Sequence, residues 1–537
     1  MSEQSERLLE AMSELPDAQI DAGAEEPPRK KSHWKRWAAL AACLAVAVLG
    51  VGTLTGLIPL EFGASAGSSG HDEATTFMSY AGPVFPLTLA EENAALTAER
   101  DITLDFAPWE PVWQEADWHD EGGFWKSGTD IGVSDAYTLR NQAAEDQTVT
   151  VLYPFASSLL ELETYLPTLA LDGTALEAEL YVGTYSGGFE GAYGQSLLEG
   201  DPAGSVNLDY AESWEDYAAL LKDGTYLANA LANGPDVSGI PVTVYRFTDP
   251  YGPAADDEAP SPSIRVSFHL DYQETTVLGY GFHAGRYDQE GGTMIQGFSI
   301  PAGQRAEDPE PYYLVILGQD IQNMTIGGYV TGGTDADTQP LADCGVTVER
   351  YKSDLDTILR EILAQIRGET FPEEEPAVDF ETYYRAFLEH LLAHGLLSDD
   401  PAERYSTGWL EEVASDVRGI DRVCWLAADV TVPAGGSVTL TASMAKAGSY
   451  DFYCADRGNQ GLYGYDLVTA LGSCLTCTEQ RATLEDRGQI EIVRQNFGFD
   501  LEQGVKTVAL DPAEPHYYLE VRRQSGTIPQ SPPEAEP

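Results

Sequence analysis

The sequence predicts a mainly β protein with appended helices (α+β), in which a single N-terminal transmembrane helix precedes two sandwich-like extracytoplasmic modules. Three observations lead to this fold class. Residues 37–58 form an uncharged apolar run of 22 residues, and about 20 apolar residues in a helix cross the core of a bilayer. Many later segments alternate apolar and polar residues with the period of a strand. A few others repeat apolar residues at helical spacing.

Basic residues gather just before the apolar run. Residues 29–36 read RKKSHWKR, and Lys and Arg collect on the cytoplasmic side of membrane helices. We therefore expect a single-pass protein of the cell membrane with its N-terminus in the cytoplasm and its C-terminal domains outside. A cleaved secretory signal is the alternative, because Ala64-Ser65-Ala66 resembles a cleavage site.

The composition changes along the chain predict seven segments. The Gly/Ser stretch GASAGSSG indicates a tether after the membrane, and GETFPEEEP indicates a linker between modules. The segments are a cytoplasmic amphipathic helix and basic flank (1–36), the transmembrane helix (37–58), the tether (59–75), a first β-rich module (76–367), the linker (368–376), a helical segment with a second β-rich module (377–523) and a disordered tail (524–537).

Negative charge is concentrated beyond the apolar run. Residues 1–36 carry eight acidic and six basic side chains, and residues 37–58 carry none. Of the formal net charge of −57, −55 therefore lies after residue 58. Such a surface repels nucleic acid and anionic lipid headgroups, so we expect no nucleic-acid partner.

Residues 4–21 read as one amphipathic helix. Its apolar stripe consists of Leu8, Leu9, Met12 and Leu15, with acidic residues on the other faces. A helix this short cannot bury the stripe within itself, and its acidic face argues against anionic lipid. We therefore expect these four residues to bind a partner protein in the cytoplasm.

Helices and a hairpin are among the elements predicted outside the membrane. Apolar residues at 3.6 spacing predict helices over residues 353–366 and 380–397. Alternating residues 136–140 and 147–153 predict two strands, and the turn residues 141–146 between them indicate a hairpin.

A sequence echo suggests that the two modules are related. Residues 310–316 read EPYYLVI and residues 514–521 read EPHYYLEV. We interpret each as the same kind of strand in one of two sandwich-like modules.

Tryptophans are unusually dense in one loop. Trp109, Trp113, Trp118 and Trp125 lie in a Pro/Gly/Asp-rich stretch. Indoles in a loop can stack on sugars or grip a peptide, and they can equally close the open end of a sandwich. The closing role is the favoured interpretation, and the alternative is that the four residues form a ligand-binding site outside the membrane.

His390 and His394 stand four residues apart on a predicted helix, a spacing at which two imidazoles can hold one metal ion. The order of residues is not HExxH, because Glu389 precedes the first histidine. Packing or surface histidines are the alternative. No cofactor is predicted, because the chain has neither a P-loop nor a dinucleotide-binding fingerprint.

Ser443 and Lys446 match SxxK, in which a helix brings lysine to a nucleophilic serine. Here Ser443 ends a β-patterned run and the motifs that complete such a site are missing. Cys474 and Cys477 match CxxC without a second pair at zinc spacing, so we interpret them as buried thiols or one disulfide.

The first 60 residues resemble the start of membrane proteins from clostridial bacteria that accompany extracytoplasmic-function sigma factors. The resemblance rests on SERLLEAMSEL, KKSHWKRW and WAALAACLAVAV. The later stretches FMSYAGPVFPL, VLYPFASSL, EIVRQNFGFDLEQG and EPHYYLEVR are similar to ectodomains of that group. The resemblance implies an anti-sigma-like protein and attaches no activity to it.

Anti-sigma factors of known mechanism carry a zinc-binding HxxxCxxC domain inside the cell. In this sequence, the only histidine before the apolar run is His33 and the first cysteine is Cys43. The zinc-binding domain is therefore absent, and a sigma factor would have to bind the amphipathic helix at residues 4–21.

These observations favour a non-catalytic, anti-sigma-factor-like sensor or regulator with an unknown extracytoplasmic ligand. The alternative is a cell-surface adhesion or glycan- or peptide-binding protein that uses the tryptophan loop. A metal-dependent hydrolase is a third possibility, for which only the histidine pair and scattered carboxylates argue.

Overall fold

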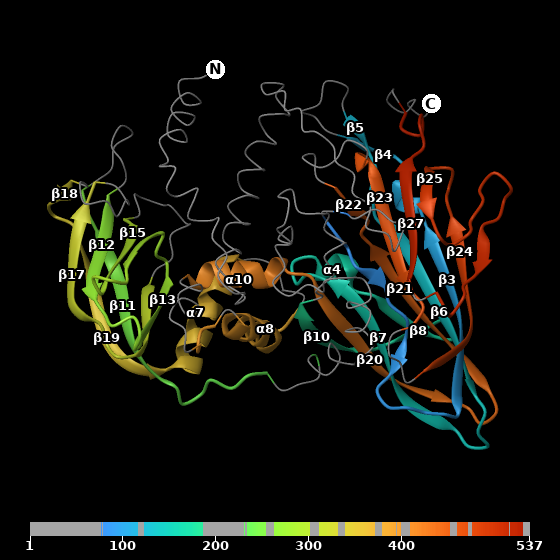
Figure 1. The fold of residues 1–537 in the computed structure, drawn as a ribbon, viewed down its shortest axis with the longest axis horizontal. Coiled ribbons are helices and arrows are strands. Elements are labelled where there is room, and N and C mark those ends of the chain that lie inside the picture. The colour runs from blue at the N-terminus through green and yellow to red at the C-terminus, as the bar shows by residue number, and fades with distance from the viewer. Residues whose placement is uncertain are drawn as a thin grey trace, which may run out of the picture.

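The protein consists of two β lobes with a layer of helices between them (Figure 1). The computed structural model confirms the mainly β class with appended helices. Among the helices that it describes, none has both the length and the apolar composition needed to cross a membrane. The predicted transmembrane run at residues 37–58 lies outside the described residues, which are 77, 79–115, 123–185, 230, 234–253, 262–300, 311–330, 339–370, 378–393, 395–398, 409–451, 459–470, 475–514 and 516–529.

The first β lobe, here called the inserted lobe, is built from residues 234–354 alone. One sheet has the order β13-β16-β11-β19, and the facing sheet has the order β14-β15-β12-β17-β18. The strands are β11 (Pro241–Tyr251), β12 (Ser263–His269), β13 (Thr275–Tyr280), β14 (Ala284–Asp288), β15 (Thr293–Ser299), β16 (Tyr312–Gly318), β17 (Gln322–Tyr329), β18 (Pro340–Leu341) and β19 (Gly345–Asp354).

Strand β16 shows why this part of the sequence reads as a continuous apolar run. Tyr312 and Leu314 point into the core between the two sheets, where the Tyr312 ring stacks on Phe298 with centroids 4.0 Å apart. The alternate residues Tyr313 and Val315 belong to a different core, on the helix side of the sheet. A strand covered on both faces needs apolar residues in both phases.

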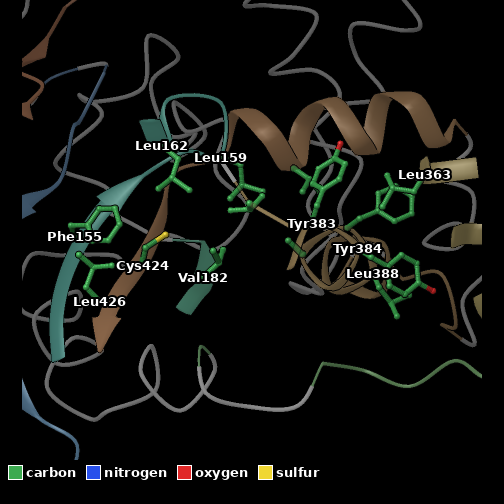
Figure 2. Packing of buried hydrophobic residues seen from close by; sticks show 14 of the residues in the cluster. Phe155, Leu159, Leu162, Val182, Leu363, Tyr383, Tyr384, Leu388, Cys424 and Leu426 are labelled. Carbon is green, nitrogen blue, oxygen red and sulfur yellow. The ribbon is translucent and has the colours of Figure 1, made fainter. Parts of the chain in front are cut away.

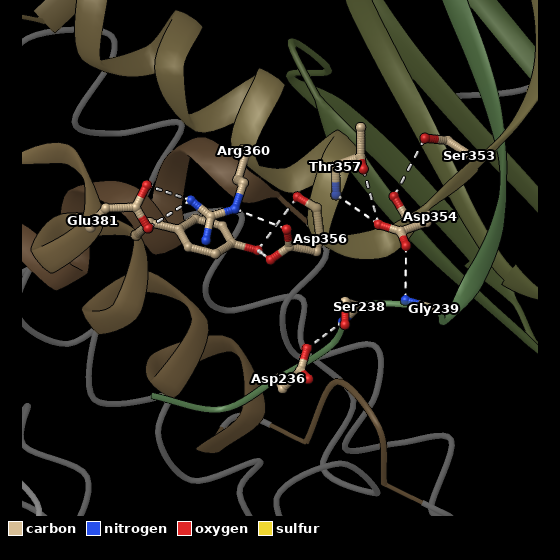
Figure 3. Close-up of polar contacts among 10 residues, drawn as sticks. Asp236, Ser238, Gly239, Ser353, Asp354, Asp356, Thr357, Arg360 and Glu381 are labelled. Carbon is tan, nitrogen blue, oxygen red and sulfur yellow. Dashed lines mark hydrogen bonds and ion pairs between the residues drawn. The ribbon is translucent and has the colours of Figure 1, made fainter. Parts of the chain in front are cut away.

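Three helices form the middle layer: α7 (Leu355–Thr370), α8 (Phe380–Ala393) and α10 (Leu410–Gly419). Helix α7 begins directly after β19, where Asp354 accepts hydrogen bonds from the backbone N–H of Thr357 (3.0 Å) and Gly239 (2.8 Å) (Figure 3). A side-chain oxygen that accepts from an amide in the first turn stabilises a helix start. Arg360 then pairs with Glu381 of α8 at 2.8 Å.

Helix α8 ends earlier than the predicted residue 397. Gly395 has a φ of +84°, a conformation that glycine adopts without steric cost. Its N–H donates to the carbonyl of Leu392, and the N–H of Leu396 donates to the carbonyl of Leu391. This pair of bonds is a Schellman motif, which terminates the helix.

The second β lobe, here called the composite lobe, is built from residues 77–185 and 420–529. A seven-stranded sheet, β26-β24-β3-β6-β21-β8-β9, faces two smaller sheets, β1-β23-β27-β25 and β10-β20-β7-β2; β22 pairs with β23. The strands are β1 (Pro83–Val84), β2 (Thr88–Leu89), β3 (Leu96–Asp105), β6 (Ile131–Asn141), β7 (Gln147–Ser157), β8 (Thr168–Leu171), β9 (Thr174–Leu176), β10 (Glu179–Tyr185), β20 (Arg422–Val432), β21 (Ser437–Lys446), β22 (Ser449–Tyr450), β23 (Leu462–Val468), β24 (Thr476–Glu485), β25 (Ile490–Gln495), β26 (Thr507–Ala509) and β27 (His516–Arg523).

Strands from the two parts of the chain pair with each other in all three sheets of the composite lobe. Strand β7 pairs with β20 over eleven residues, β6 pairs with β21, and β3 pairs in parallel with β24. The boundary predicted at residues 368–376 therefore does not separate two sets of strands. The inserted lobe and the helices instead interrupt one β lobe.

The hairpin predicted around residues 141–146 is also corrected. Strand β6 belongs to the seven-stranded sheet and β7 to the facing sheet with β20, so the turn carries the chain from one layer to the other. The two echoing segments form β16 and β27, each an interior strand of its sheet.

One apolar core joins the helices to both lobes. It contains Phe155 and Leu426 from the composite lobe, Tyr383 and Leu388 from α8, and Val315 from the inserted lobe. Figure 2 shows the side chains of the composite lobe approaching those of the helices through Leu159 and Val182. The two lobes and the helical layer are thus packed as one body.

A buried ion pair holds the three sheets of the composite lobe together. The guanidinium of Arg100 on β3 donates to both carboxylate oxygens of Asp135 on β6, each at 2.8 Å, and both side chains are 0% exposed. It also donates to the carbonyls of Val468 at the end of β23 (2.9 Å) and Phe85 between β1 and β2 (3.4 Å). Asp135 accepts from Tyr153 of β7 at 3.2 Å.

Burial alone would lower the pKa of Arg100, but the adjacent charge of Asp135 raises it above its ordinary value. Arg100 therefore stays charged in the core. Because the carboxylate also accepts a bond from the Tyr137 hydroxyl at 2.8 Å, the hydrogen-bonding capacity of both ions is used. A buried ion pair is tolerated when its hydrogen bonds are satisfied in this way.

Arg100→Met leaves the Asp135 carboxylate buried without its counter-ion. We expect the free energy of unfolding to fall by about 3–5 kcal/mol, because removing one ion of a buried pair leaves the desolvation cost of the other ion uncompensated. Urea denaturation of the purified chain measures this change. Arg140→Met is the matched control, since Arg140 pairs with Glu99 at 2.9 Å across the same two strands on the solvent face. It should cost about 0.2–1 kcal/mol, and equal losses for the two variants would contradict a structural role for the buried pair.

Candidate functional site

The structure places three of the four candidate tryptophans in different surroundings, and Trp118 lies outside the described residues. Trp109 ends the short helix η1 (Ala107–Trp109) and is 0% exposed. Its ring makes edge-to-face contacts with Phe106 and Tyr463, both with centroids 5.4 Å apart. The Arg523 guanidinium covers it at 4.8 Å. Trp109 is therefore part of the core and closes one end of the composite lobe.

Trp113 and Trp125 stand on a separate two-stranded hairpin, made of β4 (Val112–Glu115) and β5 (Gly123–Lys126). They are directly opposed across the two strands, so both indoles lie on one face. Their centroids are 5.4 Å apart at an interplanar angle of 70°. Both side chains remain partly exposed.

Gly123 makes room for the Trp113 ring. A Cβ atom at Gly123 would lie 2.8 Å from two carbon atoms of that indole and 2.4 Å from the carbonyl oxygen of Gln114. Only glycine allows this close approach of a ring to the opposite strand. Gly123 on one side and Trp125 on the other therefore hold the Trp113 ring in one orientation.

A groove of about 310 Å³ lies at the base of the hairpin. Its walls combine an indole and aliphatic side chains with one carboxylate, one ammonium group, one amide and one hydroxyl. Val112 is 67% exposed there. The lining residues are Pro108, Glu110, Val112, Trp113, Gln114, Lys126, Ser127 and Gly128.

Hydrogen bonds fix the floor of the groove to the composite lobe. The N–H of Gly128 donates to the carbonyl of Pro108 at 2.9 Å. Arg523 of β27 donates to the carbonyls of Trp109 (2.6 Å) and Gly128 (3.2 Å). The hairpin is therefore attached to a rigid sheet at its base.

The groove lies close to the junction segment, residues 79–82, through which the chain arrives from the predicted tether. Ser79 and Tyr450 exchange two backbone hydrogen bonds of 2.9 Å. Tyr450 is paired with Tyr463, the residue that contacts the Trp109 ring. Thus the junction segment and the groove occupy the same end of the β1-β23-β27-β25 sheet.

A buried cationic side chain holds the junction segment. Lys446, 6% exposed, donates from Nζ to the carbonyl of Ala81, and the N–H of Ala81 donates to Ser449 Oγ at 2.9 Å. Burial lowers the pKa of Lys446 to about 8, although Asp421 and two other carboxylates oppose this shift. Burial likewise raises the pKa of Asp421 to about 6.

The SxxK match therefore has a structural explanation. Ser443 and Lys446 both lie on strand β21, not on a helix, as the β pattern around Ser443 predicts. The sequence signal for the buried role of Lys446 is its phase, because it falls on the same face of the strand as the buried Leu440 and Ala442.

The other candidate residues are distributed as follows. His390 lies on α8 and is 8% exposed, while His394 falls outside the described residues. Within the described part of the chain, no three His, Cys, Asp or Glu side chains are grouped to hold a metal ion. Leu8, Leu9, Met12 and Leu15 also lie outside it. Cys424 is a free thiol in the shared core, where burial raises its pKa to about 12.

Sequence reasoning missed the groove residues Glu110, Gln114 and Lys126. The available signal was two short segments with strand-favouring residues, Val112-Trp113 and Phe124-Trp125, on either side of Trp118. Together they indicate a small hairpin where we had expected only a loop.

Comparison with known proteins adds no relative, since no family model, curated protein or solved structure matches the chain.

Trp109→Ala should lower the free energy of unfolding by about 3–5 kcal/mol, because it removes a large ring from a packed core. Trp113→Ala should cost much less, because that indole is partly exposed on a separate hairpin. Chemical denaturation of the two variants measures the difference. Equal losses would mean that the hairpin contributes to the core as strongly as Trp109 does.

Asp421→Asn should alter the pH dependence of stability. Since the pKa of Asp421 is about 6 in the folded chain and about 3.9 in an unfolded chain, the folded state binds more protons between these values. Its contribution to the free energy of unfolding is present below about pH 4 and is lost as the pH rises to about 6. The variant should show a flatter profile in this window, whereas Glu92→Gln, at an exposed position, should retain the wild-type slope.

Proposed function

We propose that this chain is a non-catalytic sensor or regulator, anchored in the membrane by one helix and anti-sigma-factor-like in organisation. Its ectodomain binds a ligand in the groove at the base of the β4–β5 hairpin. Residues 4–21 contact a partner in the cytoplasm, for which the resemblance of the N-terminus suggests a sigma factor. The observation that carries the proposal is the position of the groove beside the junction segment.

Few contacts separate the groove from the junction segment. The groove-lining Pro108 precedes Trp109, the Trp109 ring contacts Tyr463, and Tyr463 is paired with Tyr450. Tyr450 is in turn hydrogen-bonded to Ser79. A ligand that shifted the hairpin would therefore act close to the point at which the ectodomain joins the tether, which is where a membrane-anchored sensor needs its ligand to act.

The packing of the ectodomain supports the same role. The helices share an apolar core with both β lobes, so the ectodomain can respond to a ligand as one body. The tether predicted at residues 59–75 would have an end-to-end distance of roughly 20–25 Å as a flexible Gly/Ser chain. On this proposal the groove would lie near the outer face of the membrane.

Replacing Leu8, Met12 and Leu15 with Asp should abolish capture of the cytoplasmic partner, because charges on the apolar stripe prevent its burial against another protein. Crosslinking and pull-down of the tagged full-length protein from its own membrane, read by mass spectrometry, measures capture. A chain that lacks residues 1–28 should also lose the partner.

The matched control carries Glu6→Gln and Glu10→Gln, which alter the acidic face and leave the apolar stripe intact. It should still capture the partner. If the intact chain captures no cytoplasmic protein, the regulatory role is removed, and surface adhesion through the same groove becomes the better interpretation.

A further inference from the structure

The groove at the base of the β4–β5 hairpin combines an aromatic surface with several different hydrogen-bonding groups. Trp113 and Val112 supply apolar surface, and Gln114 and Ser127 supply neutral donors and acceptors. Small-molecule sites with this combination use the apolar surface for contact and the polar groups for orientation. A ligand that suits the groove therefore has apolar faces and hydroxyl or amide groups at its edges.

The indole of Trp113 is held in place before any ligand arrives. Trp125 contacts it edge to face at 5.4 Å, and the backbone at Gly123 leaves space for its ring. A side chain whose orientation is fixed in advance loses little conformational freedom on binding. Flat rings of this kind suit the C–H faces of pyranose sugars, which are apolar although their edges carry hydroxyls.

The charges of the groove favour a neutral ligand. Glu110 and Lys126 contribute one charge of each sign, so neither an anion nor a cation gains a net local attraction. The part of the chain beyond residue 58 carries a net charge of −55, and its field repels polyanions. Sulfated or otherwise anionic polymers are therefore disfavoured.

An extended peptide is disfavoured by the shape of the hairpin. Strands β4 and β5 have four residues each, which offers few backbone groups to an added strand. Pro111, directly before β4, lacks the N–H that would continue the ladder. The groove volume of about 310 Å³ is at the lower end of the roughly 300–1,000 Å³ typical of small-ligand sites, which suits one segment of a longer chain of sugars.

We propose that this groove binds a neutral carbohydrate chain, with Trp113 as the stacking surface and Glu110, Gln114 and Lys126 as hydrogen-bonding groups for its hydroxyls. The inference deepens the proposed function and rests on it for the biological role of binding. The sugar bound there would be the signal, or the anchoring point, outside the membrane.

The test uses the full-length protein in detergent on an array of neutral hexose and N-acetylhexosamine oligomers, with sulfated oligomers and short peptides as separate arms. The strongest neutral oligomer is then titrated by calorimetry. We expect binding to neutral oligomers, and an affinity at least tenfold lower for Trp113→Ala. Trp113→Phe, which retains a flat ring, should lose less, and Glu110→Gln should weaken binding by a few fold.

Two controls separate loss of binding from loss of folding. Thermal unfolding of each variant must match the wild type in its main transition. Tyr251→Ala removes an aromatic side chain that is 61% exposed on the inserted lobe, and it should leave the affinity unchanged.

Binding of no neutral oligomer, or equal affinity in the wild type and Trp113→Ala, would overturn the inference. Selective and Trp113-dependent binding of a peptide or a sulfated oligomer would also overturn it, while the ligand-binding role of the groove in the proposed function would stand. Sugar binding without any capture of a cytoplasmic partner would support the inference and contradict the regulatory function.

Discussion

The buried Arg100–Asp135 pair is the constraint on which the composite lobe depends. Its two ions lie on neighbouring strands of the seven-stranded sheet, yet their remaining hydrogen bonds are made to both of the facing sheets. Two backbone carbonyls of the facing layer, those of Val468 and Phe85, accept hydrogen bonds from Arg100. An apolar residue in place of Arg100 could not donate these bonds.

The candidate groove lies near the other end of the same facing sheet. Phe85, whose carbonyl Arg100 contacts, follows the junction segment and β1. Val468, whose carbonyl Arg100 also contacts, ends β23, whereas Trp109 packs on Tyr463 near the start of that strand, beside Arg523 and the base of the β4–β5 hairpin. The groove therefore stands on a part of the structure that is tied to the core at several points, whereas the hairpin above it makes its own two-stranded sheet.

Much of the local structure could be predicted from the sequence, because local signals are physical. The apolar residues of α7 recur at helical spacing, and they are the residues buried in the shared core. Helix α8 ends before the predicted residue because the backbone at Gly395 leaves the helix, a terminator that the apolar pattern does not reveal. The burial of Arg100 could also be predicted, since Arg100 lies on the same face of its strand as the buried Ile102 and Leu104.

The pairing of strands could not be predicted, because alternation shows which face of a strand is buried and not which strand lies beside it. Strands β3 and β24 are neighbours although they are separated by more than 350 residues. Likewise, tryptophans close together in the sequence indicate a loop with a particular role. Whether each indole is buried depends on residues that are far away in the sequence. Trp109 is covered by Tyr463 and Arg523, which lie far from it in the sequence. The Trp113 ring instead packs beside Trp125 and Gly123 of its own hairpin. The transmembrane helix and the cytoplasmic helix stay predictions.

The interleaving of chain ends in the composite lobe has a consequence for biogenesis. The inserted lobe is contiguous, so it can fold as soon as residues 234–354 have been synthesised. The strands before it must wait, since β7, β6 and β3 acquire their partners β20, β21 and β24 only when the last quarter of the chain arrives. During that interval they expose unpaired edges, which are open to aggregation and proteolysis. The exposure of these edges therefore lasts until the C-terminal strands emerge.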